Sequence, residues 1–358
     1  MEALVDVCSG RDYKHLTEGD IPVYGTGGYM LSVSEALSYD KDAIGIGRKG
    51  TIDKPYILNA PFWTVDTLFY AIPKEKVDLN FAFAIFQNIN WKKKDESTGV
   101  PSLSRTAINE IHILVPQYDE QQALGQLFYG IDRLITLHQR KLDKMKELKK
   151  TFLNLIFSQK LRFRGFTDSW ELRKLGEITE KITRKNQSLE SLLPLTISAQ
   201  HGLIDQNSFF NKQIASKDVS GYYLIKNGEF AYNKSYSNAY PWGAIKRLDL
   251  HDKGVLSTLY IVFKPTNVES NFLVSYYSAD NWHKEVSIRA AEGARNHGLL
   301  NISPQDFFET KLLIPNKYEE QEKIGVFFKK LDNLIIFNQD KINRLKNVKK
   351  ILLKNMLI

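Results

Sequence analysis

The sequence contains two copies of one long segment. The first copy begins at Tyr118 and reads YDEQQALGQLFYGIDRLITLHQRKLDKMKELKKTFL. The second begins at Tyr318 and reads YEEQEKIGVFFKKLDNLIIFNQDKINRLKNVKKILL, without a gap relative to the first. Each follows an apolar run ending in proline, HILVP or LLIP, which we expect to be a strand. A period this long indicates a duplicated domain with its helix, not a solenoid. The matched pairs include Gln121/Gln321, Gly125/Gly325, Phe128/Phe328, Asp132/Asp332, Gln139/Gln339, Lys150/Lys350 and Leu153/Leu353.

Both copies have the apolar spacing of a long helix. Steps of three and four residues continue through each copy, as in the seam of a coiled coil. A lone helix of about forty residues, roughly 60 Å long, would leave this seam in water. We therefore predict that the two helices pack on each other in antiparallel orientation. The predicted seam comprises Leu124, Phe128, Ile131, Ile135, Leu142, Met145, Ile324, Phe328, Leu331, Ile335, Ile342 and Leu345.

One polar residue interrupts the seam at the same place in both copies, His138 in the first and Asn338 in the second. One interpretation is that each is an ordinary seam residue that is exposed or has a hydrogen-bond partner. Alternatively, the two set the register of the helix pair, as buried polar residues do in coiled coils. The sequence leaves both interpretations open.

The segments outside the helices have a mixed pattern. Short strands rich in Tyr, Phe and Thr alternate with Gly, Pro and Asn turns, and a helix is expected over residues 79–88. We predict an α+β fold: two mixed α/β domains separated by two long antiparallel coiled-coil helices, with a pseudo-twofold internal repeat. The predicted boundaries are 1–117 for the first domain, 118–165 for the central helix, 166–317 for the second domain and 318–358 for the C-terminal helix.

The two domains are expected to differ at their leading edge. The second opens with SWELRKLGEI, and LGEI at Leu175 aligns with LVDV at Leu4, an offset of 171 residues. The counterpart of Trp170 would then fall at position −1, before the first residue. We therefore expect one of two explanations. Either translation starts earlier in the natural gene, or the first domain does without this leading segment, with a consequence for its stability at that edge.

The stretch IGIGRKGTIDKP has glycines at Gly45, Gly47 and Gly50 in the spacing of a dinucleotide-binding turn. That motif requires a helix directly after the glycines, whose N-terminus receives the pyrophosphate. Here a second β-rich run follows instead, with prolines that oppose a helix. We predict a strand-loop-strand hairpin with Arg48 and Lys49 at its tip, and no nucleotide site or oxidoreductase activity.

The composition narrows the functional classes further. A single cysteine excludes a disulfide framework and a cysteine-based metal cluster, and it suits a cytoplasmic protein. No apolar run has the length of a membrane span. No Ser-His-Asp arrangement, H-E-x-x-H motif or phosphate-cradling GKS or GKT is legible, and His201 and His297 have no second ligand at metal spacing. We predict no catalytic residue and no metal.

The net charge of +8 is unevenly distributed. Residues 118–165 carry +5 and residues 318–358 carry +4, whereas residues 1–117 carry −3. This excess of positive charge on the helices is explained equally well by solvated helix faces and by binding of nucleic acid.

Loops with cationic and amide side chains recur in both domains. Arg and Lys read guanine, Asn and Gln read adenine, and Ser, Thr and Lys hold phosphates. Any one of these loops is equally well explained as a surface turn, but their occurrence in two related and divergent domains favours DNA. The candidate contacts are Tyr24, Thr26, Gly27, Arg48, Lys49, Thr51, Lys92, Lys93, Ser102, Ser104, Arg105, Gln200, His201, Asn233, Lys234, Ser235, Asn238, Lys246, Arg295, Asn296 and His297.

Several stretches together resemble the specificity subunits of type I restriction-modification enzymes. They include PVYGTGGY, IGRKGTI, FWTVDTLFY, VPQYDEQQ, IPNKYEEQ, ISAQHGLID, FAYNKSYSNAYPWGAIKRL, GVLSTLYIVFKP and HGLLNISPQDFF. The resemblance covers essentially the whole chain. It implies a non-catalytic subunit whose two target-recognition domains each read one half of a bipartite DNA site.

The resemblance also implies partners. The helices would set the spacing between the half-sites and dock two modification subunits, which methylate adenine, and two restriction subunits would join in the full complex. S-adenosylmethionine, ATP and Mg would lie on these partners, with no cofactor in this subunit. The alternative is a stand-alone DNA- or RNA-binding adaptor that recruits no methyltransferase.

Overall fold

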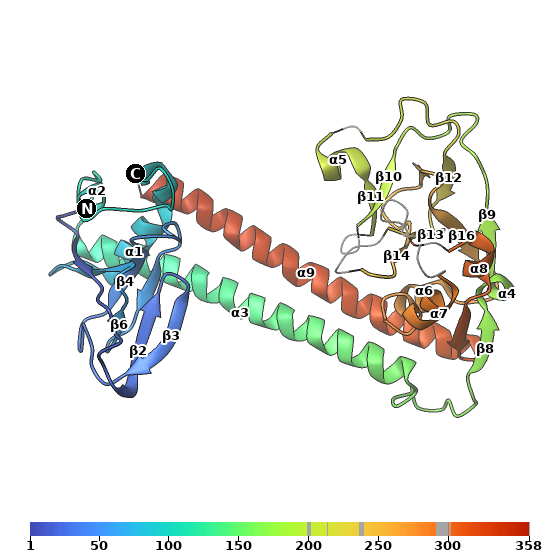
Figure 1. Ribbon diagram of the computed structural model, residues 1–358, viewed down its shortest axis with the longest axis horizontal. Helices are drawn as coiled ribbons and strands as arrows, with labels where there is room; N and C mark the ends of the chain where they lie inside the picture. The colour runs from blue at the N-terminus through green and yellow to red at the C-terminus, as the bar shows by residue number, and fades with distance from the viewer. Residues whose placement is uncertain (199–201, 213, 236–239, 291–299, 301, 358) are drawn as a thin grey trace. The chain divides into compact units, whose positions relative to one another are not determined.

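The computed structural model describes residues 1–198, 202–212, 214–235, 240–290, 300 and 302–357 (Figure 1). The chain divides into two compact units. Unit 1 consists of Met1–Leu142 and Asn338–Ile358, and unit 2 consists of Asp143–Phe337. The division passes through both long helices, so each unit has its own sheets, its own core and a part of each helix.

Unit 1 is built on two small sheets. The first is antiparallel, in the order β1 (Val5–Ser9), β7 (Leu68–Pro73), β4 (Ala43–Gly47) and β5 (Tyr56–Leu58). The second has the order β3 (Gly28–Val33), β2 (Glu18–Gly25) and β6 (Trp63–Thr64). Strand β4 is buried along its whole length. Because β5 follows β4, the glycine-rich stretch forms the predicted strand-loop-strand hairpin.

Three short helices complete unit 1. Helix α1 (Leu79–Asn88) matches the predicted range, and the Asp78 side chain caps its first turn by accepting a hydrogen bond from the Phe81 N–H. A 3₁₀ helix covers Trp91–Lys94, and α2 covers Arg105–Asn109. Side chains from α1 and the first sheet pack into one core with Trp91 and Ile108.

Unit 2 has a central antiparallel sheet in the order β14 (Ala244–Arg247), β13 (Phe230–Asn233), β16 (Ile261–Pro265) and β9 (Thr179–Ile182). Three strand pairs surround it: β10 (Leu195–Ser198) with β11 (Gly202–Asp205), β12 (Tyr223–Lys226) with β15 (Lys253–Leu256), and β8 (Glu171–Lys174) with β17 (Lys311–Ile314). Its short helices are α4 (Leu175–Ile178), α5 (Gln206–Phe210), α6 (Ser270–Tyr276), α7 (His283–Arg289) and α8 (Pro304–Phe308).

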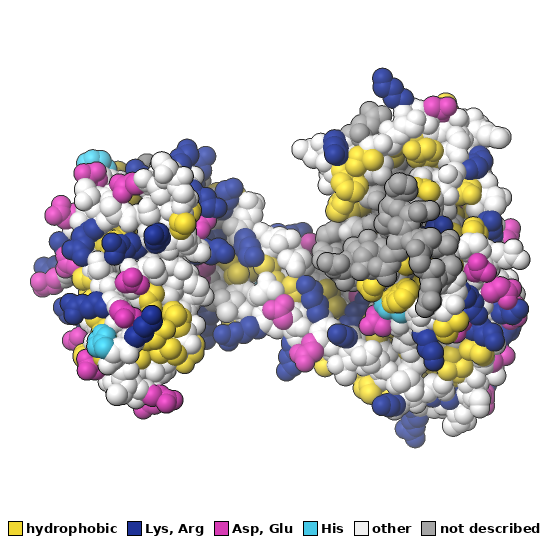
Figure 2. All heavy atoms as spheres, in the orientation of Figure 1, with side chains coloured by type: hydrophobic (Ala, Val, Ile, Leu, Met, Phe, Trp, Pro, Cys, Tyr) yellow, Lys and Arg dark blue, Asp and Glu magenta, His cyan; other side chains and the backbone are white. Residues whose placement is uncertain are grey.

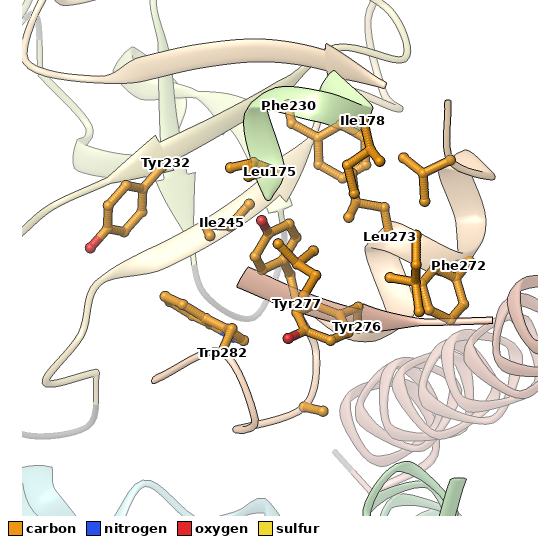
Figure 3. Packing of buried hydrophobic residues seen from close by; sticks show 14 of the residues in the cluster. Leu175, Ile178, Phe230, Tyr232, Ile245, Phe272, Leu273, Tyr276, Tyr277 and Trp282 are labelled. Carbon is orange, nitrogen blue, oxygen red and sulfur yellow. The ribbon is translucent and has the colours of Figure 1, made fainter. Parts of the chain in front are cut away.

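The core of unit 2 is aromatic. Figure 3 shows side chains from α4, the central sheet and α6 in one cluster, including Leu175, Phe230 and Phe272. Tyr277 is buried in it, and this burial raises the pKa of its hydroxyl. Edge-to-face ring pairs connect the sheet to the helices that follow it: Phe263 of β16 packs against Tyr277 at the end of α6, and Tyr277 packs against Trp282 at the start of α7.

The two long helices begin at the predicted tyrosines. Helix α3 covers Tyr118–Phe157 and α9 covers Tyr318–Met356. In unit 1, Asp132 of α3 forms an ion pair with Lys349 of α9, and Phe128 clusters with Leu353. Low residue numbers of one helix therefore lie beside high numbers of the other, so the helices are antiparallel.

Unit 2 repeats this arrangement with the helices exchanged. Lys149 of α3 forms an ion pair with Asp332 of α9, and Leu153 of α3 and Phe328 of α9 belong to one core cluster. The ion pairs Asp132–Lys349 and Asp332–Lys149 thus join matched positions of the repeat. The predicted fold class is confirmed.

The seam is buried most completely where the helices meet the domains and near the middle of each helix. Of the predicted seam residues, Leu124, Phe128, Ile131, Leu142, Ile324, Phe328 and Ile342 are buried. Ile135, Met145, Leu331, Ile335 and Leu345 are half-buried. A pair of helices shields its own seam only in part, because no third helix covers the sides within the described residues.

The interrupting polar residues differ in burial. Asn338 is buried, whereas His138 is half-buried, and its Nδ1 has no hydrogen-bond partner within the described residues. Their proposed role in register stays a prediction.

The apolar run HILVP, predicted as a strand, is not one. Residues 112–116 have no strand pairing, whereas residues 312–314 of LLIP lie in β17 and pair with β8. The difference has a physical cause: a strand needs a hydrogen-bonded neighbour, and no described residue of unit 1 corresponds to β8.

The structure also corrects the predicted alignment of the two leading edges. Lys74 N–H donates to Leu4 O, as Thr266 N–H donates to Ile178 O, so Leu4 corresponds to Ile178. MEAL, and not LVDV, is therefore the counterpart of LGEI.

Candidate nucleic-acid interface

The loop between β4 and β5 presents its cations on a fixed backbone. The Arg48 and Lys49 N–H groups both donate to Thr67 O, at 2.8 and 3.2 Å, and Gly50 N–H donates to Pro101 O at 2.8 Å. Gly50 has φ +93°, a conformation that favours glycine. A side chain at Gly47 would collide with the Thr51 carbonyl, so the loop folds back tightly on its own strand. The glycines thus shape a hairpin tip.

The two cations at this tip are held differently. The Arg48 guanidinium donates to Asp66 O at 3.4 Å and lies 5.7 Å from the centre of the Phe69 ring. Lys49 is exposed, and its ammonium has no ion-pair partner among the described side chains. The Arg48 guanidinium is therefore held by Asp66 and Phe69. Lys49 is an exposed point charge, the kind of group that contacts phosphates.

A second loop lies against the first. Lys49 and Ser102 form an isolated β-bridge, and Leu103 N–H donates to Arg48 O at 2.9 Å. Asp95 organises this loop by accepting from the Ser102 N–H at 2.9 Å, and this hydrogen bond lowers the pKa of its carboxyl. The structure thus brings two predicted sites, GRKGT and the loop before α2, into one surface.

Arg105 and Ser104 stand at the start of α2 beside this surface. Arg105 is exposed and donates to Ser9 Oγ at 3.3 Å. The Ser104 hydroxyl accepts from the Ala107 N–H at 3.0 Å, so its first role is that of a helix cap. Sequence reasoning treated Ser104 only as a phosphate contact.

Lys92 and Lys93 lie on the 3₁₀ helix and are exposed. Lys92 forms a 3.0 Å ion pair with Asp53, which follows the hairpin tip, and its hydrogen bond lowers the pKa of that carboxyl. The 3₁₀ helix is thereby joined to the same region. Figure 2 shows that basic and acidic side chains are interspersed on the visible face of unit 1.

The remaining candidates of unit 1 belong to the β2–β3 hairpin. Tyr24 is half-buried between the rings of Tyr29 and Tyr56, so its ring contributes mainly to packing. Thr26 and Gly27 form the turn. The Tyr56 hydroxyl donates to Gly25 O at 2.6 Å and attaches this turn to β5.

In unit 2, Asn233, Lys234 and Ser235 lie where β13 ends. Asn233 Oδ1 accepts from the Ser235 N–H at 3.0 Å, and its Nδ2 is 3.5 Å from the Tyr260 hydroxyl. Lys234 donates to Ile302 O at 3.2 Å, and burial lowers the pKa of its ammonium. These side chains hold the end of the strand in place, which sequence reasoning had not anticipated.

Lys246 on β14 lies near the helix pair of unit 2. Burial lowers the pKa of its ammonium, and the charge of Lys149 lowers it further, whereas Asp332 opposes this. The prediction took Lys246 as a DNA contact, and its neighbours here are the ion-paired residues of α3 and α9.

Six predicted contacts lie outside the described residues. They are Gln200, His201, Asn238, Arg295, Asn296 and His297.

Exposed aromatic residues are a feature that sequence reasoning missed. Phe209 and Phe210 on α5 are 51% and 43% exposed, and their rings form an edge-to-face pair. Tyr29 on the β2–β3 hairpin is 63% exposed. In the sequence, the only sign of their exposure was a position beside polar turns. Buried aromatic residues also occur at such positions, so this sign did not distinguish them. In minor-groove binders, exposed apolar side chains such as Phe insert between base steps.

Within the described residues, no three His, Cys, Asp or Glu side chains gather as a metal-binding group. No described helix has the length and apolar character to cross a membrane.

Comparison with known proteins identifies relatives. Residues 8–147 match the family model of the type I restriction modification DNA specificity domain. The specificity subunit of the type I restriction enzyme MjaVIII from Methanocaldococcus jannaschii is 26% identical over 147 residues, which are 40% of this chain and 33% of that protein. The C-terminal part of a putative type I specificity subunit from Mycoplasma pneumoniae is 23% identical over 148 residues, covering 41% of this chain and 95% of that protein. The chain thus spans a third of the length of the first relative.

Two solved structures share the fold. A type I restriction-modification S subunit from M. genitalium has a TM-score of 0.67 at 16% identity, covering 100% of this chain and 94% of that one. A chain from a structure that describes complex assembly and conformational transition of the type I R-M system has a TM-score of 0.50 at 13% identity, covering 99% and 95%. The resemblance that the motifs indicated is confirmed.

Proposed function

We propose that this chain is a specificity subunit of a type I restriction-modification system and that it reads a bipartite DNA site. The match of residues 8–147 to the DNA specificity domain model and the fold shared with a type I S subunit support this proposal. Each unit's strand-and-loop domain would recognise one half of the site. The two domains share a helix repeat and differ in their loops, as two readers of different half-sites should.

The observation that carries this proposal is the paired-loop surface of unit 1, formed by residues 47–51 and 95–105. Its backbone is fixed by hydrogen bonds from Arg48, Lys49 and Gly50, while the side chains of Lys49 and Arg105 extend into solvent. A fixed backbone with outward cations suits a duplex, since phosphate contacts set register and one orientated arginine reads a base edge.

We further propose that the helices dock the modification subunits. In unit 1, Leu134 and Leu137 of α3 are 47% and 50% exposed. In unit 2, the matched residues of α9, Leu334 and Phe337, are 51% and 65% exposed. An apolar row repeated at matched positions supports two equivalent partners, because a partner would remove these side chains from water. Methylation, S-adenosylmethionine, ATP and Mg would belong to partner subunits, and this chain would contribute no catalytic group.

The proposal is tested by expressing the chain with its modification subunits and mapping adenine methylation by single-molecule sequencing. A split motif with a fixed gap is expected, and it should disappear when this chain is omitted. Methylation without a split motif would refute bipartite reading. If the chain binds DNA but does not co-purify with the modification subunits, it is the stand-alone adaptor.

A further inference from the structure

In unit 1, the chain that leaves β1 is held against β6. A side chain at Gly10 would collide with the Val65 carbonyl, so the backbone passes close to β6 at this point. Arg11 N–H donates to Thr64 O at 2.9 Å, and Arg11 O accepts from the Trp63 indole N–H at 3.0 Å. The position of Arg11 is therefore set by hydrogen bonds of its backbone.

The side chain of Arg11 takes no part in this attachment. The hydrogen bonds described for Arg11 are made by its backbone, its side chain is exposed, and it forms no ion pair within the described part of unit 1. The backbone thus presents an unpaired guanidinium at a fixed place on the surface. Its fork of N–H donors matches the oxygens of a phosphate group.

Arg11 lies at the same end of the first sheet as the paired-loop surface. The preceding residue, Gly10, donates its N–H to Leu68 O at 3.0 Å. The neighbouring carbonyl, that of Thr67, accepts from both N–H groups of residues 48–49 at the hairpin tip. The start of β7 therefore holds the end of β1 and the tip of the β4–β5 hairpin next to each other.

Arg105 at the start of α2 connects the paired-loop surface with the end of β1. Its guanidinium donates to Ser9 Oγ, the last residue of β1, at 3.3 Å. Burial raises the pKa of the Tyr70 hydroxyl, whereas the positive charges of Arg11 and Arg105 lower it. Both guanidinium groups therefore lie near the same hydroxyl on β7.

We propose that Arg11 is a further DNA contact of unit 1 and that, together with Arg105, it binds one backbone phosphate of the half-site. The inference rests on the proposed reading of DNA by unit 1. Within the described residues neither guanidinium pairs with a carboxylate, so both charges are available to a phosphate. Two arginines that donate to one phosphate form short, charge-assisted hydrogen bonds.

This contact positions the duplex and does not select a base. Contacts to phosphates fix the register of a protein on DNA, whereas contacts to base edges carry the sequence information. Arg48 is held by Asp66 and Phe69 and meets a base edge, while Arg11 and Arg105 hold the backbone beside it. Arg11 therefore contributes affinity to every sequence equally.

The test measures DNA binding by the complex of this chain with its modification subunits. Arg11→Ala should weaken binding about tenfold, and reduce the slope of log affinity against log salt by about one, on cognate and unrelated duplexes alike. Alanine keeps the backbone hydrogen bonds of Arg11, so the variant should fold as the wild type does. Arg11→Lys keeps the charge and should restore the slope.

The control is Lys41→Ala. Lys41 is exposed and precedes β4, at the opposite end of that strand from the hairpin tip. This variant removes the same charge as Arg11→Ala, and it should change neither the affinity nor the salt slope. A loss equal to that of Arg11→Ala would mean that net charge alone is responsible, and would overturn the inference.

Uncharged DNA linkages locate the phosphate. Each phosphate of the half-site read by unit 1 is replaced in turn by a methylphosphonate. At one position the replacement should weaken binding of the wild type and have no further effect on Arg11→Ala or Arg105→Ala, since the contact is already lost.

Two failures are distinguishable. If the wild-type complex bound its motif and Arg11→Ala bound it equally well, or if every methylphosphonate weakened the wild type and Arg11→Ala to the same degree, this inference alone would be overturned. A wild-type complex that preferred no duplex would refute the proposed function, and this inference with it.

Discussion

Gln121 of α3 accepts a hydrogen bond from the backbone N–H of Asp78 at 3.2 Å, and so joins the first turn of the long helix to the cap of α1. Gln321 of α9 does the same for Glu269, the cap of α6, at 2.9 Å. Both glutamines are buried. The matched glutamines therefore fix each domain to the beginning of its own helix.

Gly125, one turn further along α3, lets the helix approach the cap of α1 closely. A side chain at Gly125 would collide with the Asp78 carboxylate and the Phe81 N–H. Gly125→Ala should therefore lower the free energy of unfolding of unit 1 by about 1–3 kcal/mol, the usual cost of overpacking. The measurement is urea unfolding followed by circular dichroism.

The same helix offers a matched control. Gly130 has open space around it, so Gly130→Ala should stabilise the protein by about 0.5–1 kcal/mol through helix propensity alone. If the two substitutions shifted the urea midpoint equally, close packing at Gly125 would not be the reason for that glycine.

The sequence was sufficient to predict elements whose signal is local. The start of α3 at Tyr118, the range of α1 and the hairpin after Gly45 follow from periodicity and turn chemistry. HILVP failed because strand formation depends on a neighbour distant in the chain. Burial of the seam at Ile135 was overestimated, because two helices alone leave its flanks in water.

Candidate contacts were harder to predict than elements. Arg48 and Lys49 were predicted at a hairpin tip, but the loop of residues 95–105 that joins them is brought there only by tertiary hydrogen bonds. Ser104 has the residue type of a phosphate contact and of a helix cap, and only the structure distinguishes these.

His283 should make the stability of unit 2 depend on pH. Burial lowers the pKa of its imidazole below 6.5, while Asp280 partly opposes this. Between the two pKa values the unfolded chain binds more protons than the folded one, so the free energy of unfolding falls as pH falls below 6.5. His283→Asn should flatten this dependence in thermal unfolding between pH 7.5 and about 5.

The variant Asp280→Asn tests the direction of this pH dependence. Removing the carboxylate that favours the imidazolium should lower the pKa of His283 further, so the loss of stability at acid pH should grow. A smaller acid dependence in this variant would contradict the account.

Lys49 and Arg48 should affect DNA binding in different ways. Lys49→Ala should weaken binding of the assembled methyltransferase equally for all sequences, and reduce the slope of log affinity against log salt by about one. Arg48→Ala should cost about 1–3 kcal/mol and relax the preference at one base pair of the half-site, because its guanidinium is orientated by Asp66 and Phe69.

The control for both is Lys74→Ala, at the opposite end of β7 from the hairpin tip. It should change neither affinity nor preference. If Lys49→Ala left the salt slope unaltered, the hairpin tip would not be part of the DNA interface.

The length of the helix pair should set the gap between the half-sites. Seven residues inserted after Leu142 in α3 and after Phe337 in α9, where the two units divide, would keep the seam in register and lengthen both helices by about 10 Å. At 3.4 Å per base pair, the methylated motif should keep both halves and gain about three base pairs between them. Methylome sequencing would measure this, with the same insertion in α3 alone as the control that should abolish methylation. An unchanged gap would mean that something other than the helices sets the spacing.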